Sequence, residues 1–232
     1  MKIAVVSCLH GNEGYGIEVG RRLQSIPFFI ANENALRENK RFIDEDLNRC
    51  FPGKEDGNTE EQSAYNLLKK LKNFDYVIDL HSSSNECPLF GIVTKPNKEK
   101  IGLARKLGLK KLIIMPKFFA SGKALIDHVK CGISLEIGPH EKKDNVNKVV
   151  KAIKNLIKNK ENREISIYKV SNIIRKEFEG KILIKNFKKV KRGQLIAKEV
   201  ERKQIAKFDF IPVFVNEEAY EGLLCLAAKR IA

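Results

Sequence analysis

Apolar residues along the chain occur in short runs, and polar or amphipathic segments separate these runs. Residues 2–8 (KIAVVSC), 76–82 (YVIDLHS) and 132–138 (GISLEIG) are too short to be buried helices, and β-branched side chains are frequent in them. They are therefore predicted to be buried strands. Shorter runs of the same kind predict further strands at residues 27–31, 88–94 and 111–115.

The segments between these strands have the apolar spacing of amphipathic helices. Helices are predicted over residues 14–24, 59–73, 97–108, 121–129 and 145–160. Thr59 is expected to cap the second of them, with Glu61 and Gln62 in its first turn. Strands that alternate with helices favour an α/β fold, in which helices cover both faces of a mostly parallel sheet.

The pattern changes near residue 163, where short apolar runs become separated by Gly, Asn and charged residues. These runs cover residues 164–170, 173–178, 181–186, 194–200, 210–215 and 223–231. Their spacing is typical of hairpins. The sequence therefore predicts two domains, an α/β domain over residues 1–160 and a small β-rich domain over residues 161–232.

The composition is that of a globular chain with a core of its own. Of its 232 residues, 43% are hydrophobic, but no segment approaches the roughly 18 apolar residues of a membrane-spanning helix. The N-terminus lacks the pattern of a signal peptide. Five scattered cysteines form no CxxC pair, which argues against a disulfide framework or a thiolate zinc site. A cytoplasmic location without membrane contact is expected.

The positive charge of the chain is unevenly distributed. The formal net charge is +15, yet residues 141–207 hold 21 Lys and Arg against 8 Asp and Glu, so they carry most of the excess. Lysine-rich helices usually present a solvated face. A nucleic-acid-binding module remains an alternative; its binding would weaken with salt and would not need Glu136. Because aromatic residues are sparse there, nucleic acid is not the expected partner.

The segment HGNEGYG follows the first predicted strand and allows two interpretations. A dinucleotide-binding loop requires the pattern GxGxxG, but Gly14, Gly16 and Gly20 are spaced one residue too far apart. That interpretation also leaves His10 and Glu13 without a purpose. A metal site explains both, because a His and a Glu three residues apart on a loop can converge on one ion.

A metal site of this kind needs a third ligand. His81 ends the strand YVIDLHS, and ligands of parallel α/β sheets bind at the carboxyl ends of the strands. Two His and one Glu that leave a fourth position open are a catalytic zinc set. Asp79 lies on the same face of that strand and could support a ligand as its hydrogen-bond partner.

Two other places in the sequence could carry chemistry. Residues 39–53 (NKRFIDEDLNRCFPG) are dense in Arg, Asp and Asn, and Asn48 and Arg49 would suit a substrate carboxylate. The alternative is an Arg–Asp network that braces the loop. Glu136 lies within an apolar strand, so it is either a general base or a carboxylate satisfied by structural partners.

In their order along the chain, the motifs HGNE, RFIDEDLNRCFPG, DLHS and LEIGP resemble those of the succinylglutamate desuccinylase and aspartoacylase family. PVFVNEEAY, residues 212–220, is similar to the closing motif of aspartoacylase. These enzymes are relatives of the zinc carboxypeptidases and remove the acyl group from N-acyl amino acids. The resemblance implies a zinc-carboxypeptidase-like fold, with a mixed, mostly parallel sheet flanked by helices and a small C-terminal β-rich domain.

The resemblance also implies roles for individual residues. It places one Zn²⁺ per chain on His10, Glu13 and His81, and it makes Glu136 the base that activates water. Catalysis is further assigned to Arg41, which would polarise the amide carbonyl and stabilise the oxyanion.

Substrate binding is implied for a second group of residues. Asn48 and Arg49 would hold the α-carboxylate of the amino acid, with Asp46 orienting Arg49, and Tyr220 would reach into the pocket from the C-terminal domain. Aspartoacylase binds the aspartate side chain with an Arg from the segment before the catalytic Glu. This chain has no Arg between Arg105 and Arg163, so Lys123 is the cation expected there.

Together these observations predict a zinc-dependent amidohydrolase whose first expected substrate is N-acetyl-aspartate or a similar N-acyl acidic amino acid. The resemblance also implies a small substrate in place of a peptide, because the gap of 71 positions between His10 and His81 is shorter than in peptidases of this type and the C-terminal domain resembles the one that narrows the channel in aspartoacylases. A desuccinylase, a carboxypeptidase and a zinc-binding homologue without activity are the alternatives. The expected partner is the small substrate, and a homodimer is left open.

Overall fold

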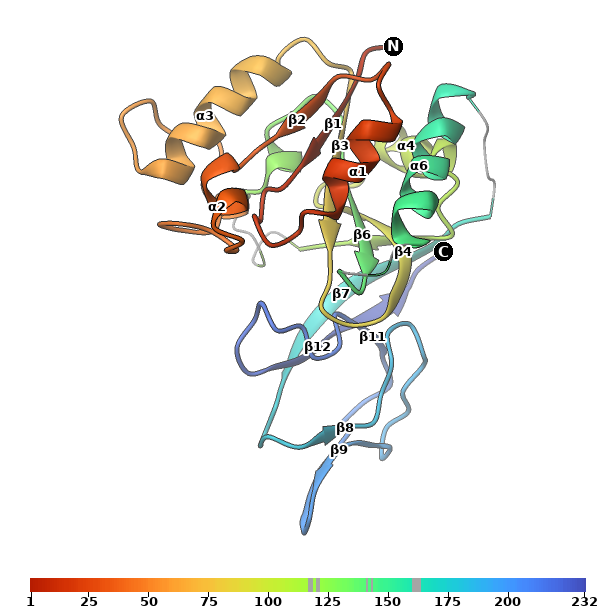
Figure 1. The fold of residues 1–232 in the computed structure, drawn as a ribbon. Coiled ribbons are helices and arrows are strands. Elements are labelled where there is room, and N and C mark those ends of the chain that lie inside the picture. The colour runs from red at the N-terminus through yellow and green to blue at the C-terminus, as the bar shows by residue number, and fades with distance from the viewer. Residues whose placement is uncertain (117–118, 120–121, 141, 143, 160–163) are drawn as a thin grey trace.

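A nine-stranded sheet runs through most of the molecule (Figure 1). The computed structural model describes residues 1–116, 119, 122–140, 142, 144–159 and 164–232. The strand order of the large sheet is β11-β12-β7-β5-β4-β6-β3-β1-β2. Its strands are β1 (Ile3–Ser7), β2 (Phe28–Ile30), β3 (Tyr76–Ser82), β4 (Cys87–Val93), β5 (Lys111–Ile114), β6 (Gly132–Gly138), β7 (Ser166–Arg175), β11 (Ile211–Val213) and β12 (Leu223–Arg230).

The sheet is mixed but mostly parallel. Strand β1 pairs in parallel with β2 and with β3, and β3 pairs in parallel with β6. Strand β4 is antiparallel to β6 and parallel to β5, which in turn is parallel to β7. The last two strands, β12 and β11, are added in antiparallel fashion. The predicted fold class is confirmed.

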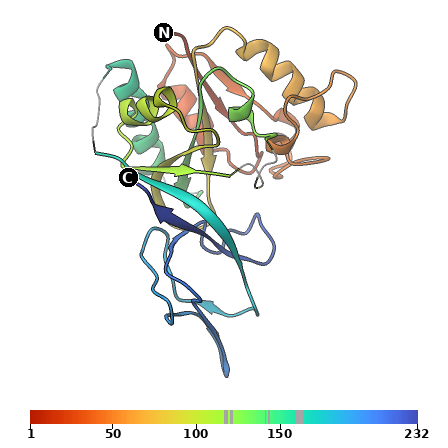
Figure 2. The same cartoon turned by 180° about the vertical axis from the view of Figure 1, so that it is seen from behind.

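Helices cover both faces of the N-terminal part of the sheet (Figures 1 and 2). On one face, α1 (Tyr15–Arg22), α4 (Lys98–Lys106) and α6 (Asp144–Ile157) bury their apolar sides against alternate residues of the strands, such as Val5 and Ile78. On the other face, α3 (Thr59–Leu71) packs over Ala4, Val6 and Val77. The short helix α2 (Glu33–Arg37) follows β2.

The pairing of β3, β6 and β4 places chemically different side chains on one face of the sheet. His81 is opposite Glu136 and Asp79 is opposite Ser134, and Glu136 in turn pairs with Phe90 of β4. Since residues two apart in a strand point to the same face, this register sets a polar strip beside an apolar one. The apolar side chains at Ile133, Leu135 and Ile137 point to the opposite face, into the core under α6.

The C-terminal segment contributes to two sheets. Strands β7, β12 and β11 extend the large sheet, whereas β8 (Lys181–Ile182), β9 (Leu195–Glu199) and β10 (Arg202–Ile205) form a separate antiparallel sheet. The two strands predicted at residues 164–170 and 173–178 are largely one continuous strand, β7. The proposed boundary at residue 160 therefore separates segments that share one sheet.

Two local predictions were wrong. The cap of α3 is Asn58, whose side chain accepts from the Glu61 backbone N–H while the Glu61 side chain accepts from the Asn58 N–H; Thr59 is the first helical residue. The helix predicted over residues 121–129 begins outside the described residues, and its described part is a single 3₁₀ turn, Leu125–Asp127. Among the described residues, none of the helices is both long and apolar enough to cross a membrane.

A buried carboxylate of α3 holds the loop that precedes the 3₁₀ helix η1 (Leu47–Arg49). Glu60 is 0% exposed, and its two oxygens accept hydrogen bonds from the backbone N–H groups of residues 43–45 and from the Asn32 side chain, at 2.8–3.4 Å. The carboxylate thus fixes the path of the chain just before Asp46.

Replacing Glu60 with Gln is expected to destabilise the fold by about 3 kcal/mol, because an amide NH₂ would face backbone N–H donors in a buried site. Chemical denaturation of the variant and the wild type measures the loss. The matched control is Glu38→Gln at an exposed position, which should stay within about 0.5 kcal/mol of the wild type. Equal stability of all three proteins would contradict the anchoring role of Glu60.

Candidate metal centre and substrate cavity

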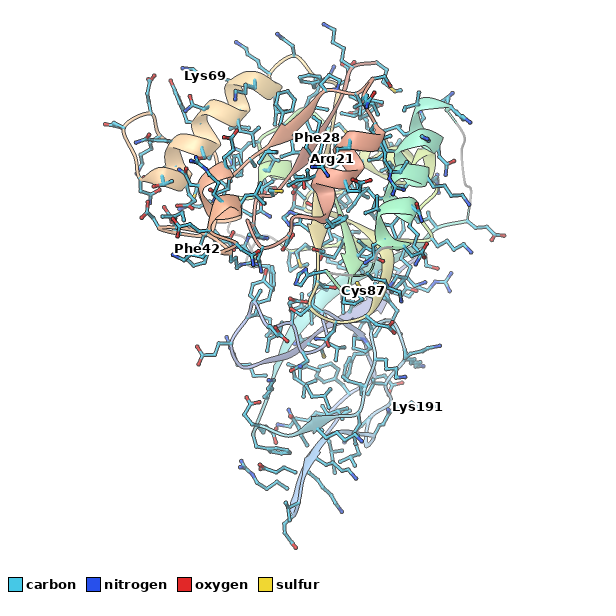
Figure 3. All side chains as sticks on the ribbon, viewed as in Figure 1. Arg21, Phe28, Phe42, Lys69, Cys87 and Lys191 are labelled. Atoms are coloured by element: carbon cyan, nitrogen blue, oxygen red, sulfur yellow. The ribbon has the colours of Figure 1, made fainter. Side chains whose placement is uncertain are left out.

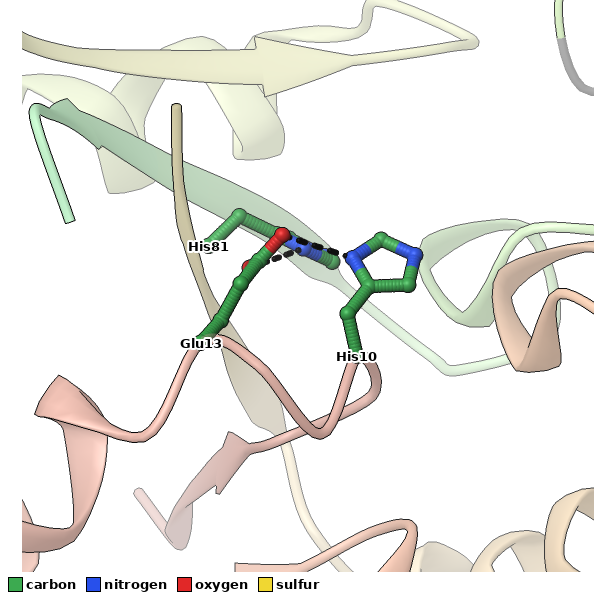
Figure 4. Close-up of side chains that lie close together, drawn as sticks. All are labelled: His10, Glu13 and His81. Carbon is green, nitrogen blue, oxygen red and sulfur yellow. Dashed lines mark hydrogen bonds and ion pairs between the residues drawn. The ribbon is translucent and has the colours of Figure 1, made fainter. Parts of the chain in front are cut away.

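Three buried side chains converge at the carboxyl ends of β1 and β3 (Figure 4). His10 and Glu13 lie on the loop between β1 and α1, and His81 comes from β3. Their ligand atoms all lie within 4.8 Å of one another. Gly11 is required in this loop, because a Cβ there would lie 2.1 Å from the backbone of Ala35.

Both imidazole rings present Nδ1 to the same carboxylate. Nδ1 of His10 is 2.8 Å from Oε1 of Glu13, and Nδ1 of His81 is 3.2 Å from Oε2. The Ser82 backbone N–H donates to the same Oε2 at 3.0 Å. Two nitrogens and a carboxylate oxygen at these positions match the donor set that zinc takes in catalytic sites. The three residues therefore fit a zinc ion.

The second nitrogen of each ring is held by another carboxylate. Nε2 of His10 is 3.0 Å from Oδ1 of Asp46, and Nε2 of His81 is 2.7 Å from Oδ2 of Asp79. The Ser134 hydroxyl donates to the same Asp79 oxygen at 3.0 Å. When Nδ1 binds a metal, Nε2 carries the proton, and its N–H donates a hydrogen bond to the carboxylate. The two carboxylates fix both the tautomer and the orientation of the rings.

The charges of the cluster shift the pKa of its members. Burial alone would raise the pKa of Glu13, but His10 and His81 outweigh it and hold that pKa well below its usual range. Burial alone would lower the pKa of His81, but Asp79 and Glu13 raise it well above its ordinary value. In the absence of metal, His81 therefore holds a proton that an incoming cation must displace.

Glu136 lies beside His81 on the neighbouring strand β6, and it lines the same cavity. It is buried, and burial is the main reason that its pKa is raised well above the ordinary value; His81 opposes the shift, and Glu13 and Glu217 add to it. A carboxylate with a raised pKa is a better proton acceptor. The structure thus brings the expected base next to the expected ligands.

Arg41 reaches the cluster from the loop before η1. Its Nη2 donates to Oδ2 of Asp46 at 3.0 Å, and its Nη1 is 3.7 Å from Oε1 of Glu13. Asp46 thus contacts Arg41 and His10. The expected orienting contact from Asp46 to Arg49 does not appear among the hydrogen bonds and ion pairs of the described residues, because the carboxylate of Asp46 faces the metal ligands.

Asn48 and Arg49 line the cavity from η1. Asn48 is held by the Leu125 backbone N–H, which donates to its Oδ1 at 3.0 Å. Arg49 donates through Nη1 to the Asn48 carbonyl at 2.8 Å and through Nη2 to the Tyr220 hydroxyl at 3.4 Å. Tyr220 therefore reaches the cavity from the C-terminal segment, as expected, and its ring also lies 5.8 Å from the Arg41 guanidinium.

The wall of the cavity away from the histidines is apolar. It is formed by Ile92, Met115, Phe119, Ala124, Ile126 and Phe214, and Thr94 and Ser134 add hydroxyls. Lys123 is not part of it. Its side chain is exposed, and its carbonyl accepts a hydrogen bond from the Phe51 N–H. Among the described lining residues, the guanidinium and ammonium groups are those of Arg41 and Arg49.

Glu217 is a lining residue that the sequence did not single out. It is buried, and it accepts hydrogen bonds from the backbone N–H and the hydroxyl of Ser84, the latter at 2.6 Å. This contact ties the C-terminal segment to the loop after His81. The available signal was its place in NEEAY, three residues before the end of a motif in which only the tyrosine was assigned a role.

The family model described as "Succinylglutamate desuccinylase/Aspartoacylase catalytic domain" matches residues 1–158, which is more than half of the chain. The chain belongs to the succinylglutamate desuccinylase/aspartoacylase family. The matched range includes the candidate ligands and Glu136, whereas Tyr220 and Glu217 lie outside it.

Curated relatives of this family are similar over part of the chain. A probable aspartoacylase of Trichodesmium erythraeum is 32% identical over 104 residues, which are 36% of this chain and 36% of the relative. An N-acyl-aromatic-L-amino acid amidohydrolase (carboxylate-forming) of Xenopus tropicalis is 28% identical over 171 residues, 60% of this chain and 54% of the relative. The matches span about a third to a half of these relatives.

Solved structures show that the family fold extends over the whole chain. The crystal structure of murine aminoacylase 3 has a TM-score of 0.83 at 21% identity and covers 100% of this chain and 95% of its own. The crystal structure of a succinylglutamate desuccinylase/aspartoacylase from Rhodobacter sphaeroides has a TM-score of 0.79 at 15% identity. The match covers 100% of this chain and 86% of that one. The C-terminal segment thus has its counterpart in the family fold.

Asp79→Asn is expected to weaken zinc binding about tenfold or more. The variant loses the carboxylate charge that accepts from the His81 Nε2–H, and this makes the imidazole a weaker ligand. Competition with a chromophoric chelator measures the affinity. Asp75→Asn is the matched control, because Asp75 precedes the same strand but is partly exposed and pairs with Lys130. If both variants bind zinc like the wild type, Asp79 does not support the ligand.

The affinity for zinc is expected to rise with pH. His81 has a raised pKa and is protonated near neutral pH in the metal-free chain, so binding releases its proton. The apparent affinity should increase about tenfold per pH unit while one proton is displaced. Chelator competition at three pH values around neutrality gives the slope, and calorimetry in buffers of different ionisation enthalpy counts the protons. An affinity independent of pH would contradict this account.

Proposed function

We propose that this chain is a zinc-dependent hydrolase that cleaves the amide bond of small N-acyl amino acids. The observation that carries the proposal is the convergence of His10, Glu13 and His81 beside Glu136, in a cavity that also contains two arginines. A metal, a base, an oxyanion partner and a carboxylate partner are the elements that hydrolysis of such an amide requires. Membership in the family supports the same reaction.

The proposed roles follow from the positions of the side chains. A zinc ion held by the three ligands would supply a Lewis acid that polarises the scissile carbonyl and acidifies a water molecule. Glu136 takes the proton from the attacking water and delivers it to the departing amine, so that one carboxyl serves as base and then as acid. Its place opposite His81 on the neighbouring strand sets this carboxyl beside the proposed ligands.

Arg41 and Arg49 have separate tasks in this proposal. Arg41, held by Asp46 and close to Glu13, lies near the ligands and stabilises the charge that develops on the carbonyl oxygen. Arg49, held between the Asn48 carbonyl and Tyr220, binds the α-carboxylate in the bidentate manner that guanidinium groups allow. Asn48 and Tyr220 position Arg49 for this contact.

The cavity favours an apolar side chain on the amino acid over an acidic one. Both arginines are occupied by the roles above, Lys123 faces solvent, and the remaining wall is formed by aliphatic and aromatic side chains such as Met115 and Phe119. Glu217 adds a buried carboxylate to the lining. Among the described lining residues, an aspartate side chain would find no cation beyond the two arginines already assigned a role, and burying it unpaired is costly. The proposed substrates are therefore N-acetyl derivatives of aromatic or large aliphatic amino acids, in place of N-acetyl-aspartate.

Release of free amino acid from a substrate panel tests this proposal. The panel contains the N-acetyl derivatives of L-phenylalanine, L-leucine and L-aspartate, N-succinyl-L-glutamate, and an N-blocked dipeptide with C-terminal phenylalanine. The zinc-loaded chain should prefer the first two by at least about tenfold in kcat/KM, which corresponds to 1.4 kcal/mol of differential binding. Glu136→Gln should lower the rate by about 10²–10⁴-fold while the zinc content stays unchanged.

The other outcomes separate the alternatives. Preference for N-acetyl-aspartate would indicate an aspartoacylase, and preference for N-succinyl-L-glutamate would indicate a desuccinylase. Preference for the dipeptide would indicate a carboxypeptidase. If Glu136→Gln retains full activity, the assignment of the base is wrong, and if activity persists after zinc is removed with a chelator, the metal mechanism is wrong.

A further inference from the structure

The strongest charged feature outside the cavity is a row of lysines on the side of the molecule that carries α6. Residues 181–198 contain seven Lys and Arg and no Asp or Glu. In Figures 1 and 2 the segment that follows β8 lies on the same side of the molecule as α6. The hydrolysis proposed above uses none of these residues.

A groove joins the two elements. It is lined by Lys142 and Lys148 on one wall and by Lys185 and Lys188 on the other, with Glu86 as the acidic residue among its described lining. Lys142, Lys185 and Lys148 all act to lower the pKa of Glu86, the hydrogen bond from Lys142 being the largest cause. These three ammonium groups therefore crowd around one carboxylate, and their charge exceeds what it can balance.

The row continues from both ends of the groove. Along α6, Lys148, Lys151 and Lys154 follow one another at intervals of three residues and are exposed, so they form a stripe about 9 Å long on its solvent side. At the other end, Lys191 is exposed beyond Lys188 (Figure 3). Together, Lys142, Lys148, Lys151, Lys154, Lys185, Lys188 and Lys191 are called the lysine track below.

Few acidic groups neutralise the track. Lys142 pairs with Glu86 at 3.0 Å and Lys148 with Asp144 at 2.8 Å. For the other members, the described residues provide no ion pair within 4.0 Å. Exposed ion pairs contribute little energy. An anion with several charges can therefore displace the carboxylates of Glu86 and Asp144 from these lysines. Seven ammonium groups against two carboxylates leave a net charge of +5 on the track.

We propose that the lysine track binds the phosphate backbone of double-stranded nucleic acid without reading its sequence. Several charges along an extended line suit a polymer with one negative charge per roughly 1.7 Å of axis better than a single small anion. Lysine binds phosphate as a point charge, so it fixes position and carries no information about the bases.

The apolar content of this surface separates the proposal from other partners. Aromatic residues of the basic stretch are not free to stack on bases: Tyr168 is buried, Phe187 packs on Phe90, and Phe178 lies under Arg202. Single strands are usually held by such stacking, and protein interfaces by buried aromatic anchors. A duplex needs neither, since its backbone alone supplies the contacts.

Fluorescence anisotropy with a labelled 20-base-pair DNA duplex tests the proposal. If five lysines contact phosphates, the slope of log K against log salt is about −4.5, which is an affinity loss of about 500-fold between 50 and 200 mM salt. Lys185→Ala combined with Lys188→Ala should reduce the slope by about 1.8. Glu136→Gln should bind like the wild type.

The matched control removes two lysines at the C-terminal end of α3, Lys70→Ala in the last turn with Lys72→Ala at the C-cap. Figure 3 places Lys69 of the same helix and Lys191 on opposite sides of the molecule, and this control should leave binding unchanged. Should the first double variant fail to fold, Lys148→Ala with Lys151→Ala on α6 must give the same reduction in slope. Three results would overturn the proposal: no binding at 50 mM salt, equal slopes in all variants, or binding of poly-glutamate in place of the duplex.

Discussion

The geometry of the site depends on the carboxylate of Glu13, which stands between Nδ1 of His10 and Nδ1 of His81. This carboxylate ties a loop to a strand 68 residues away in sequence. It is buried, and its charge is stabilised by two imidazoles, a backbone N–H and the nearby Arg41 guanidinium. The same arrangement that stabilises the metal-free chain leaves three donor atoms facing one point.

A second set of carboxylates orients the members of this candidate metal site. Asp46 and Asp79 hold the outer nitrogen of each ring, and Asp46 also holds Arg41. The loop that carries Asp46 is fixed in turn by Glu60, which is anchored in α3. The position of the metal ligands and that of the proposed oxyanion partner are therefore set by one chain of contacts, and a change in the loop would affect both.

Part of this arrangement could be predicted from the sequence, because strands and their carboxyl ends leave a strong local signal. The run YVIDLHS places Asp79 and His81 on one face of a strand, and the alternation of strands and helices brings that strand end to the same edge as His10. The role of Asp46 could not be derived in this way. Its partners lie 5 and 36 residues away, and only the folded loop decides which arginine it meets.

The substrate side chain and the basic stretch were harder for the same reason. Ile92 and Met115 are ordinary core residues in the sequence, and only the register of β4, β5 and β6 brings them to the same cavity as the histidines. The lysines around residues 142 and 185 are far apart in the chain, and they form one track only because the segment after β8 returns beside α6. Local sequence patterns carry no information about contacts between residues that are far apart in the chain.

X-ray absorption spectroscopy of the zinc-loaded chain tests the central claim most directly. The account predicts one zinc per chain with two imidazole nitrogens, at least one carboxylate or water oxygen at about 2.0–2.2 Å, and no sulfur ligand. The Glu13→Gln variant should lose most of this signal at the same zinc concentration. A spectrum with sulfur at about 2.3 Å, or full zinc occupancy in the variant, would contradict the site described above.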